Sequence, residues 1–515
     1  MRKRGSQMHL VMSDCYEKLV PPDHFLRNLD KALDFGFVEN LCRDKYRVVD
    51  GGPGRAAEPP VRLFKLLLLM FLYQVKFERE LERRANDTIS WRWFCAYAPD
   101  DPVASHKTMW LFRNRLGPEV FDAAFAEVLK RCIDSGLVDN KRWHVDATKQ
   151  DAAATRFSQH DVAVILTQAM VARIRENAGA DEVDTGAPPV EMDDDMKLLV
   201  AKAACEAARL KTSNPRRVLA KSEAREYVPV EEKEDTCDPT DPEPDPRLSE
   251  LKSMAVEMEK NLAPCAGDKD ARIGRTPSIS NFCGYISTVV VDEKHGVALG
   301  YETFAGNVDQ TKTFQGPYSD ARLSCGKPDE LVADSGFDHL DIRKLVVKDG
   351  VAGYISMMKP RGRTAVYGSD RFKVTKDGDR YRVECPAHRF MRDLGGTREG
   401  YRIFRGEECS ECGLRERCTA DKNGSRKFQF NPEFRVFQEK QWLLRKTEEY
   451  KRAMKARMAT IEPVFGHAKT YHNLGKCIYR SKPMNAIQTT MSLLTVNLEK
   501  LMRYGHKPQE AQYGY

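Results

Sequence analysis

The sequence has no long apolar run and no visible signal peptide. Its longest apolar run, Leu66–Tyr73, is far shorter than the roughly 20 residues that span a bilayer. Arg2, Lys3 and Arg4 stand near the N-terminus, but no apolar segment with a small-residue cleavage site follows them. We therefore expect a cytoplasmic protein without a membrane partner.

Closely spaced cysteines are also scarce, because most of the 14 stand singly, as in proteins of a reducing compartment. The exception is a cluster of four: Cys385, Cys409, Cys412 and Cys418. A C-x₂-C pair with two further thiols supplies the four soft ligands of a structural Zn²⁺ site, and His388 could replace one of them. Four reduced thiols without a metal, or a redox pair, are the alternatives. We favour zinc in a small insertion like a zinc ribbon, since strand-like segments flank the cluster.

Acidic residues are nearly absent from one C-terminal stretch. Between Arg452 and Lys482, seven Lys or Arg and two His accompany a single carboxylate, Glu462. Acids are instead concentrated in residues 181–195 and 226–246, which contribute −7 and −8 to the formal net charge of +7. The rest of the chain therefore carries +22. Such a basic body suits a polyanionic partner, although a solvated basic surface would give the same composition.

The first 135 residues have a helical pattern. Val61–Tyr73 is a dense apolar segment, and Ser105 is placed to cap a helix over residues 106–116. That second helix carries the basic residues Lys107, Arg113 and Arg115. Two short helices joined by a turn, the second one basic, are compatible with a helix-turn-helix, but any small helical bundle with a basic surface would have this pattern.

The centre of the chain changes to strand patterns. Apolar and polar residues alternate over 141–150, a hairpin is predicted over 284–307, and short strands are predicted near 329–338 and 351–363. Helices are predicted over 437–461 and 485–504. A long helical segment follows residue 156, and we interpret 226–246 as a flexible linker. This order predicts a mixed α/β sheet covered by helices and interrupted by insertions.

Two aspartates share one sequence context. Asp146 and Asp334 each end an apolar strand segment, so on neighbouring strands their carboxylates would lie close together and repel each other. A divalent ion removes that conflict, and carboxylate oxygens are the ligands that Mg²⁺ or Mn²⁺ prefers. Glu462 is the candidate third carboxylate. Each residue also has a structural interpretation: the aspartates could end a turn or cap a helix, and Glu462 could pair with Arg457. Pro463 favours a break or a kink directly after Glu462.

With these segments in view, the chain resembles the bacterial insertion-sequence transposases, whose ribonuclease H-like catalytic domain carries an Asp-Asp-Glu (DDE) triad. The similarity covers most of the chain. "LLLLMFLYQVKFERELERRANDTISWRWFC" and "SHKTMWLFRNRL" are similar to the N-terminal helical domain of these proteins, and "HVDATKQDAAAT" to their first catalytic strand. "LVADSGFD" is similar to the second catalytic segment and "RMATIEPVFGHAK" to the helix that bears the glutamate.

The resemblance implies a site and its partners. Asp146, Asp334 and Glu462 would be the catalytic metal ligands, with two Mg²⁺ or Mn²⁺ ions, and Arg457 and Lys469 would contact DNA phosphate. The superfamily's Tyr before the Arg is missing here, and the spacing from Arg457 to Glu462 is one residue longer than in the best-known members. Double-stranded DNA would be the partner, a homodimer would form on it, and the protein would associate with the nucleoid. Further basic residues expected to hold the DNA backbone are Lys359, Arg361, Arg363, Arg480 and Lys482.

The expected organisation follows. We predict a helical DNA-binding domain (1–135), the first catalytic strand (136–155), a helical insertion with an acidic linker (156–270), a ribonuclease H-like core (271–380), a Cys-rich insertion (381–430) and C-terminal catalytic helices (431–515). The expected function is metal-dependent DNA cleavage and strand transfer at the ends of an insertion sequence. A catalytically inactive DNA-binding descendant of a transposase, or a metal-dependent nuclease without strand transfer, are the alternatives. His144 and His467 lie near the candidate carboxylates and receive no role.

Overall fold

A computed structural model describes residues 15–45, 57–152, 155–156, 159–180, 192–208, 215, 218–219, 222, 246–261, 265–276, 279–357, 367–419 and 425–505. The chain forms two compact units. One consists of Met1–Gln150, Ile286–Phe304 and Val308–Tyr515, and the other of Asp151–Tyr285 and Ala305–Asn307. Lys359, Arg361, Arg363 and most of the two acidic segments lie outside the described residues.

The larger unit begins with short helices. They are α2 (Phe25–Ala32), α3 (Phe37–Cys42), α4 (Pro60–Leu72), α5 (Glu78–Asp87), α6 (Ile89–Phe94), α7 (His106–Leu116) and α8 (Pro118–Asp134). Helix α4 starts with a proline at its first position and buries apolar residues on most of its circumference, as a central helix must. The predicted cap of α7 is confirmed, since the Ser105 side chain accepts a hydrogen bond from the Thr108 backbone N–H.

A mixed sheet follows these helices, with the strand order β6-β5-β1-β7-β8. Its strands are β1 (Arg142–Asp151), β5 (Ile279–Asp292), β6 (Ala298–Ala305), β7 (Glu330–Ala333) and β8 (Ala352–Ile355). Strand β1 pairs with β7 in parallel, with Val145 opposite Ala333, and β7 pairs with β8 in parallel, with Ala333 opposite Ile355. The predicted α/β class and the strands around Asp146 and before Asp334 are therefore confirmed.

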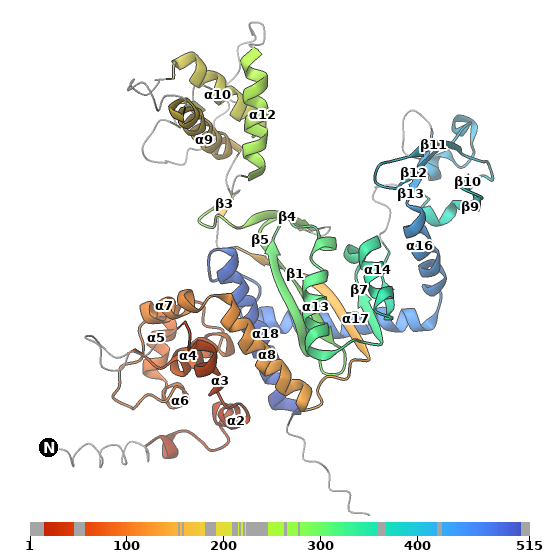
Figure 1. The fold of residues 1–515 in the computed structure, drawn as a ribbon. Helices are drawn as coiled ribbons and strands as arrows, with labels where there is room; N and C mark the ends of the chain where they lie inside the picture. The colour runs from red at the N-terminus through yellow and green to blue at the C-terminus, as the bar shows by residue number, and fades with distance from the viewer. Residues whose placement is uncertain are drawn as a thin grey trace, which may run out of the picture. The chain divides into compact units, whose positions relative to one another are not determined.

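Helices cover this sheet and share its core. Segments η1 (Gln310–Lys312), α13 (Gln315–Cys325), η2 (Ser335–Phe337) and α14 (Leu340–Lys348) connect the strands, and α18 (Lys482–Tyr504) packs along α8 (Figure 1). One continuous apolar cluster includes Leu67 of α4, Phe121 of α8, Val145 of β1 and Leu494 of α18. The N-terminal helices and the sheet thus stabilise each other through a common core.

The helical region before α18 differs from the prediction. The single helix expected over 437–461 is wrong, because α16 (Pro432–Leu444) ends before α17 (Glu448–Tyr471) begins. Thr447 starts the second helix: its side chain accepts the Tyr450 N–H, and two glutamates in the first turn complement the helix dipole. Of the break or kink expected at Pro463, the break is wrong, since α17 continues through this proline, and the kink stays a prediction.

The Cys-rich segment has its own small core. Strands β9 (Lys373–Asp377) and β10 (Arg380–Glu384) form an antiparallel pair, and β11 (Arg392–Gly396), β12 (Arg402–Arg405) and β13 (Lys427–Phe430) form a three-stranded antiparallel sheet. Short helical segments accompany them: η3 (Ser369–Arg371), η4 (Cys409–Glu411) and α15 (Arg415–Cys418). Phe372, Phe404, Phe428 and Phe430 fill the core. The strands predicted over 372–383 and 400–406 are confirmed as β9, β10 and β12.

The smaller unit is mainly helical in its described part. It contains α9 (Gln159–Ala180), α10 (Asp194–Ala207), α12 (Pro246–Asn261) and the short strands β2 (Thr155–Arg156), β3 (Cys265–Ala266) and β4 (Arg272–Thr276). Leu166, Val200 and Leu248 bring the three helices together in one apolar cluster. Strand β4 pairs antiparallel with the first half of β5. Across both units, none of the described helices has the length and hydropathy of a membrane span.

Two glycines give opposite predictions for stability. A methyl group on Gly300 of β6 would collide with the Pro317 carbonyl oxygen in α13, whereas Gly466 of α17 has no atom within 4 Å of that position. We expect Gly300→Ala to destabilise the fold by about 1–3 kcal/mol through overpacking. Gly466→Ala should stabilise it by about 0.5–1 kcal/mol because alanine loses less backbone entropy in a helix. Thermal unfolding midpoints measure both changes, and a lower midpoint for Gly466→Ala would contradict the open surroundings of that residue.

Candidate active site

The two predicted aspartates come from neighbouring parallel strands. Asp146 lies on β1 directly after Val145, and Asp334 follows Ala333, the last residue of β7. Because Val145 and Ala333 are opposite each other in the ladder and both point into the core, the next residues of both strands face the other side of the sheet together. The register thus brings the two carboxylates to one place.

Charge and burial act against each other at Asp146. Burial is the largest influence and raises the pKa of the Asp146 carboxyl, and the negative charge of Asp334 raises it further. The positive charge of Arg457 and the Ala147 N–H, which donates to Asp146 Oδ1 at 2.8 Å, both lower it. The net direction is upward. The electrostatic effect of Asp334 on Asp146 is independent support for their proximity.

Arg457 supplies the cation of this site. Its Nη1 donates to Asp146 Oδ2 at 2.7 Å, and the two side chains are only 14% and 19% exposed. The helix is held over the sheet by Tyr450 and Ala453, which pack against Val332 of β7. Arg457 lies one turn after Ala453, on the same face of α17, and therefore reaches the aspartates. The alternative pairing of Arg457 with Glu462 is not what the structure has.

Glu462 lies elsewhere on the same helix. It is exposed, and five residues separate it from Arg457, which places it about 140° around the helix. The carboxylates of Asp146, Asp334 and Glu462 are not all within 4.8 Å of one another. The structure thus brings together Asp146, Asp334 and Arg457. Glu462 lies on α17, the same helix as Arg457.

His144 is a core residue. Its ring is fully buried and its Nε2 lies 2.9 Å from Glu293 Oε2. Burial is the main cause that lowers the pKa of His144 to about 4, so the ring is neutral at physiological pH. Arg142 bonds Glu293 as well, which satisfies the carboxylate from two sides.

Comparison with known protein families assigns two parts of this chain. Residues 14–115 match a transposase domain (DUF772), and residues 385–502 match a transposase DDE domain. Both matches support an insertion-sequence DDE transposase. No curated protein matches this chain. The second matched segment contains Glu462, Arg457 and the four clustered cysteines of this transposase, whereas Asp146 and Asp334 lie outside both matches.

The basic residues predicted to bind DNA have different surroundings. Lys107, Arg115, Arg480 and Lys482 are exposed, and Lys469 is half-buried. Arg113, in contrast, is 4% exposed, forms an ion pair with Glu78, and its guanidinium carbon lies 3.7 Å from the centre of the Tyr479 ring. Arg113 thus links α7 to α5 and to the segment before α18. Because its charge is buried inside the fold, we do not include Arg113 in the proposed DNA interface.

The four cysteines line one small cavity in the Cys-rich segment. Cys385 follows β10, Cys409 begins η4, Cys412 follows it, and Cys418 ends α15. Burial is the main cause that raises the pKa of Cys418; Arg426 lowers it, and the nearby thiols of the other three cysteines raise it further. The four sulfur atoms are not, however, all within 4.8 Å of one another. His388 is largely exposed and bonds Glu384, so it does not point into this cavity.

Sequence reasoning missed two features of this transposase. It did not find the Arg457–Asp146 ion pair, for which the only signal was the helical spacing from Ala453 to Arg457. It also missed a group of side chains formed by His467, His472 and Glu499. Two histidines five residues apart were visible at the end of α17, but nothing in the sequence indicated that α18 would fold back and bring Glu499 to them.

The ion pair predicts a pH-dependent stability difference. Because the pKa of Asp146 is higher in the folded than in the unfolded chain, its contribution favours folding at low pH and is lost as the pH rises through that pKa. In the wild type, the positive charge of Arg457 stabilises the ionised Asp146 carboxylate. Arg457→Met removes this charge, so we expect the folded state to lose about 3 kcal/mol of stability at neutral pH. The deficit should shrink as acid protonates Asp146. Thermal melting across pH measures it, with Arg452→Met, an exposed arginine of the same helix, as the control. A deficit that stays constant with pH would assign Arg457 a packing role instead.

Proposed function

We propose that this transposase binds the ends of its insertion sequence as double-stranded DNA and catalyses metal-dependent cleavage and strand transfer there. Asp146, Asp334 and Glu462 are the proposed catalytic residues. The observation that carries the proposal is the register of β1 and β7, which brings two carboxylates together where a cation would relieve their repulsion.

The fold is compatible with the proposed ribonuclease H-like assignment. Strands β1 and β7, whose segments resemble the first and second catalytic segments of the family, belong to one sheet with the β5–β6 hairpin, and β1 is central in it. We assign Asp146 and Asp334 to the first and second catalytic segments because the resemblance implies these roles. We therefore retain the predicted ribonuclease H-like core, interrupted by a helical insertion after β1 and by the Cys-rich insertion after β8.

Side chains of the proposed site fit a hard divalent cation. Carboxylate oxygens are the donors that Mg²⁺ and Mn²⁺ select, and the DDE transposase family uses divalent metal ions. When bound, such ions activate the attacking oxygen and stabilise the leaving oxygen of a phosphodiester. Arg457 occupies the place of a cation beside Asp146, so its guanidinium would compete with a metal ion for Asp146 Oδ2. Once released, Arg457 is free to contact DNA phosphate, as the family resemblance implies.

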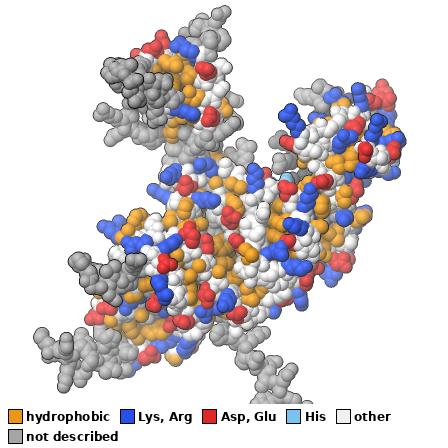
Figure 2. Space-filling model, in the orientation of Figure 1, with side chains coloured by type: hydrophobic (Ala, Val, Ile, Leu, Met, Phe, Trp, Pro, Cys, Tyr) orange, Lys and Arg blue, Asp and Glu red, His pale blue; other side chains and the backbone are white. Residues whose placement is uncertain are grey.

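Basic side chains outside the triad are proposed to hold the DNA backbone. Lys and Arg are spread over the face shown in Figure 2 and alternate there with acidic residues. The proposed contacts are the separate residues Lys107, Arg115, Lys469, Arg480 and Lys482, together with Lys359, Arg361 and Arg363, which lie outside the described residues. Contacts with phosphate fix the position of the protein on the DNA but do not distinguish one base sequence from another. Two element ends require two active sites, so we propose a homodimer on DNA.

The Cys-rich segment is proposed to bind structural Zn²⁺. Cys385, Cys409, Cys412 and Cys418 provide four thiols around one cavity, and thiolates are preferred zinc ligands. Gly406 fits this role, because a methyl group there would come within 2.5 Å of the Cys409 sulfur and push it aside.

Glu462 is the residue that decides the catalytic proposal. With Mg²⁺ and DNA that carries the terminal repeats of the element, we expect Glu462→Gln to reduce cleavage about a hundredfold or more while DNA binding persists. Glu448→Gln, which changes an exposed carboxylate in the first turn of the same helix, should cleave like the wild type. Cleavage and gel-shift assays measure the two effects. If Glu462→Gln cuts at the wild-type rate, Glu462 has no place in the triad.

A further inference from the structure

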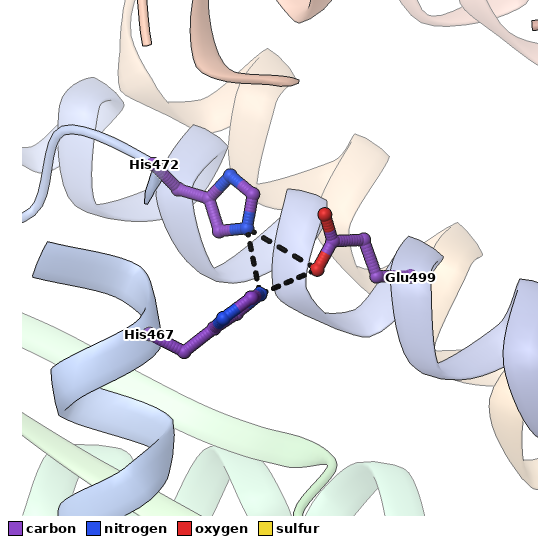
Figure 3. Close-up of side chains that lie close together, drawn as sticks. All are labelled: His467, His472 and Glu499. Atoms are coloured by element: carbon purple, nitrogen blue, oxygen red, sulfur yellow. Dashed lines mark hydrogen bonds and ion pairs between the residues drawn. The ribbon is translucent and has the colours of Figure 1, made fainter. Parts of the chain in front are cut away.

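A second group of potential metal ligands lies away from the aspartates. His467 is in the last turns of α17, His472 follows the end of that helix, and Glu499 is on α18 (Figure 3). Their reactive atoms face one another: His467 Nε2 lies 2.5 Å and His472 Nε2 3.3 Å from Glu499 Oε2, and the two Nε2 atoms are 3.2 Å apart. Among the described residues, these three form a group of His, Cys, Asp or Glu ligand atoms that all lie within 4.8 Å of one another.

A hydrogen bond at the other side of the ring determines which nitrogen of His472 is available. His472 Nδ1 lies 3.0 Å from the Phe71 carbonyl oxygen of α4. A carbonyl oxygen only accepts, so Nδ1 carries the proton and neutral His472 has its lone pair on Nε2. That lone pair points at a carboxylate oxygen and at the Nε2 of His467.

The three contacts among His467, His472 and Glu499 cannot all be hydrogen bonds while both histidines are neutral, because too few protons are available. An ionised Glu499 carboxylate only accepts hydrogen bonds. With Glu499 Oε2 and His472 Nε2 both acceptors, a neutral His467 has one Nε2–H to share between them. The contact between His472 and Glu499 then joins two acceptors. A second proton on His472, or a cation bound between the two acceptor atoms, would make this contact favourable.

Distances and donors match a tetrahedral transition metal. Zn²⁺ binds imidazole nitrogen and carboxylate oxygen at about 2.0–2.2 Å, so two ligands of a tetrahedral site are about 3.3 Å apart. Two of the three contacts already have this length, at 3.2 and 3.3 Å. The third, between His467 and Glu499, must open by somewhat under 1 Å, and these side chains are 37% and 32% exposed. That exposure also leaves room for water as a fourth ligand.

The surroundings hold His472 in place without a metal. Its ring is 1% exposed, its Nδ1 is held by the Phe71 carbonyl, and its own carbonyl accepts the Ser492 hydroxyl of α18 at 2.5 Å. The next residue, Asn473, donates to the Met70 and Val75 carbonyls. A histidine whose second nitrogen is bonded to a carbonyl is the usual arrangement around a protein-bound metal, because it fixes the tautomer and the ring orientation.

We propose that His467, His472 and Glu499 bind a divalent transition-metal ion, with Zn²⁺ as the best match. Imidazole ligands select zinc over Mg²⁺, so this site differs in chemistry from the carboxylate pair. The ion fastens the C-terminal end of α17 to α18 and, through His472, to α4. It stabilises the helix that carries Arg457 and Glu462 and takes no part in the reaction. The site does not depend on the function proposed above.

The full-length protein tests this site once the cysteine cluster is disabled. In a background with Cys385, Cys409, Cys412 and Cys418 all changed to Ser, the protein is loaded with Zn²⁺, freed of excess metal and analysed for metal content. We expect His467→Ala in this background to bind one ion less per chain than its parent. His339→Ala, which changes another partly exposed histidine, should match the parent. Zinc should raise the melting temperature of the parent and of His339→Ala, and leave that of His467→Ala unchanged.

Two further measurements separate loss of the metal from misfolding and from binding by a thiolate. Glu499→Gln keeps the shape of the side chain and should also lose the ion, so the test does not rest on one variant that could misfold. Co²⁺ bound in the same background should show visible absorption without a sulfur-to-metal charge-transfer band, since the proposed ligands include no thiolate. Equal metal content in the parent, His467→Ala and Glu499→Gln would overturn the proposal. So would a parent that retains no metal, which would mean that a proton on His472 resolves the cluster.

Discussion

The parallel pairing of β1 with β7 forces Asp146 and Asp334 together, and much of the site follows from the repulsion between them. Val145 and Ala333 are fixed in the core opposite each other, so the carboxylates that follow cannot separate without breaking the register. Burial makes the conflict more severe, and Arg457 relieves it with a 2.7 Å hydrogen bond to Asp146. Both the ion pair between Arg457 and Asp146 and the packing of Tyr450 and Ala453 on Val332 therefore hold α17 over the sheet.

Helix α17 connects this site to the rest of the larger unit. Tyr450 and Ala453 pack against the sheet, Ile461 and Val464 enter the main core, and His472 reaches the Phe71 carbonyl of α4. The segment matched by the transposase domain (DUF772) and the helices of the DDE domain thus share one core. In such an arrangement a displacement of α17 by DNA would affect both the aspartates and the N-terminal helices.

Local features of the sequence predicted local features of the fold. The alternation around Asp146, the short apolar segment before Asp334 and the cap at Ser105 all depend on neighbours in the chain, and the structure has each of them. Contacts between distant segments were not predictable in this way. Arg113 was counted as a surface cation, yet Glu78 and Tyr479 enclose it. The ion pair between Arg457 and Asp146 was not predicted, and the DNA contact of Arg457 stays a prediction. The role of Glu462 rests on the family resemblance.

The most direct test of the central claim is a crystal structure of the full-length protein with Mn²⁺ and DNA, with the metal located by anomalous scattering. A peak between the carboxylates of Asp146 and Asp334, with the Arg457 guanidinium moved away from Asp146, is the result we predict. A structure with no peak there and with Arg457 still bonded to Asp146 would contradict the claim that these two aspartates form a cation site.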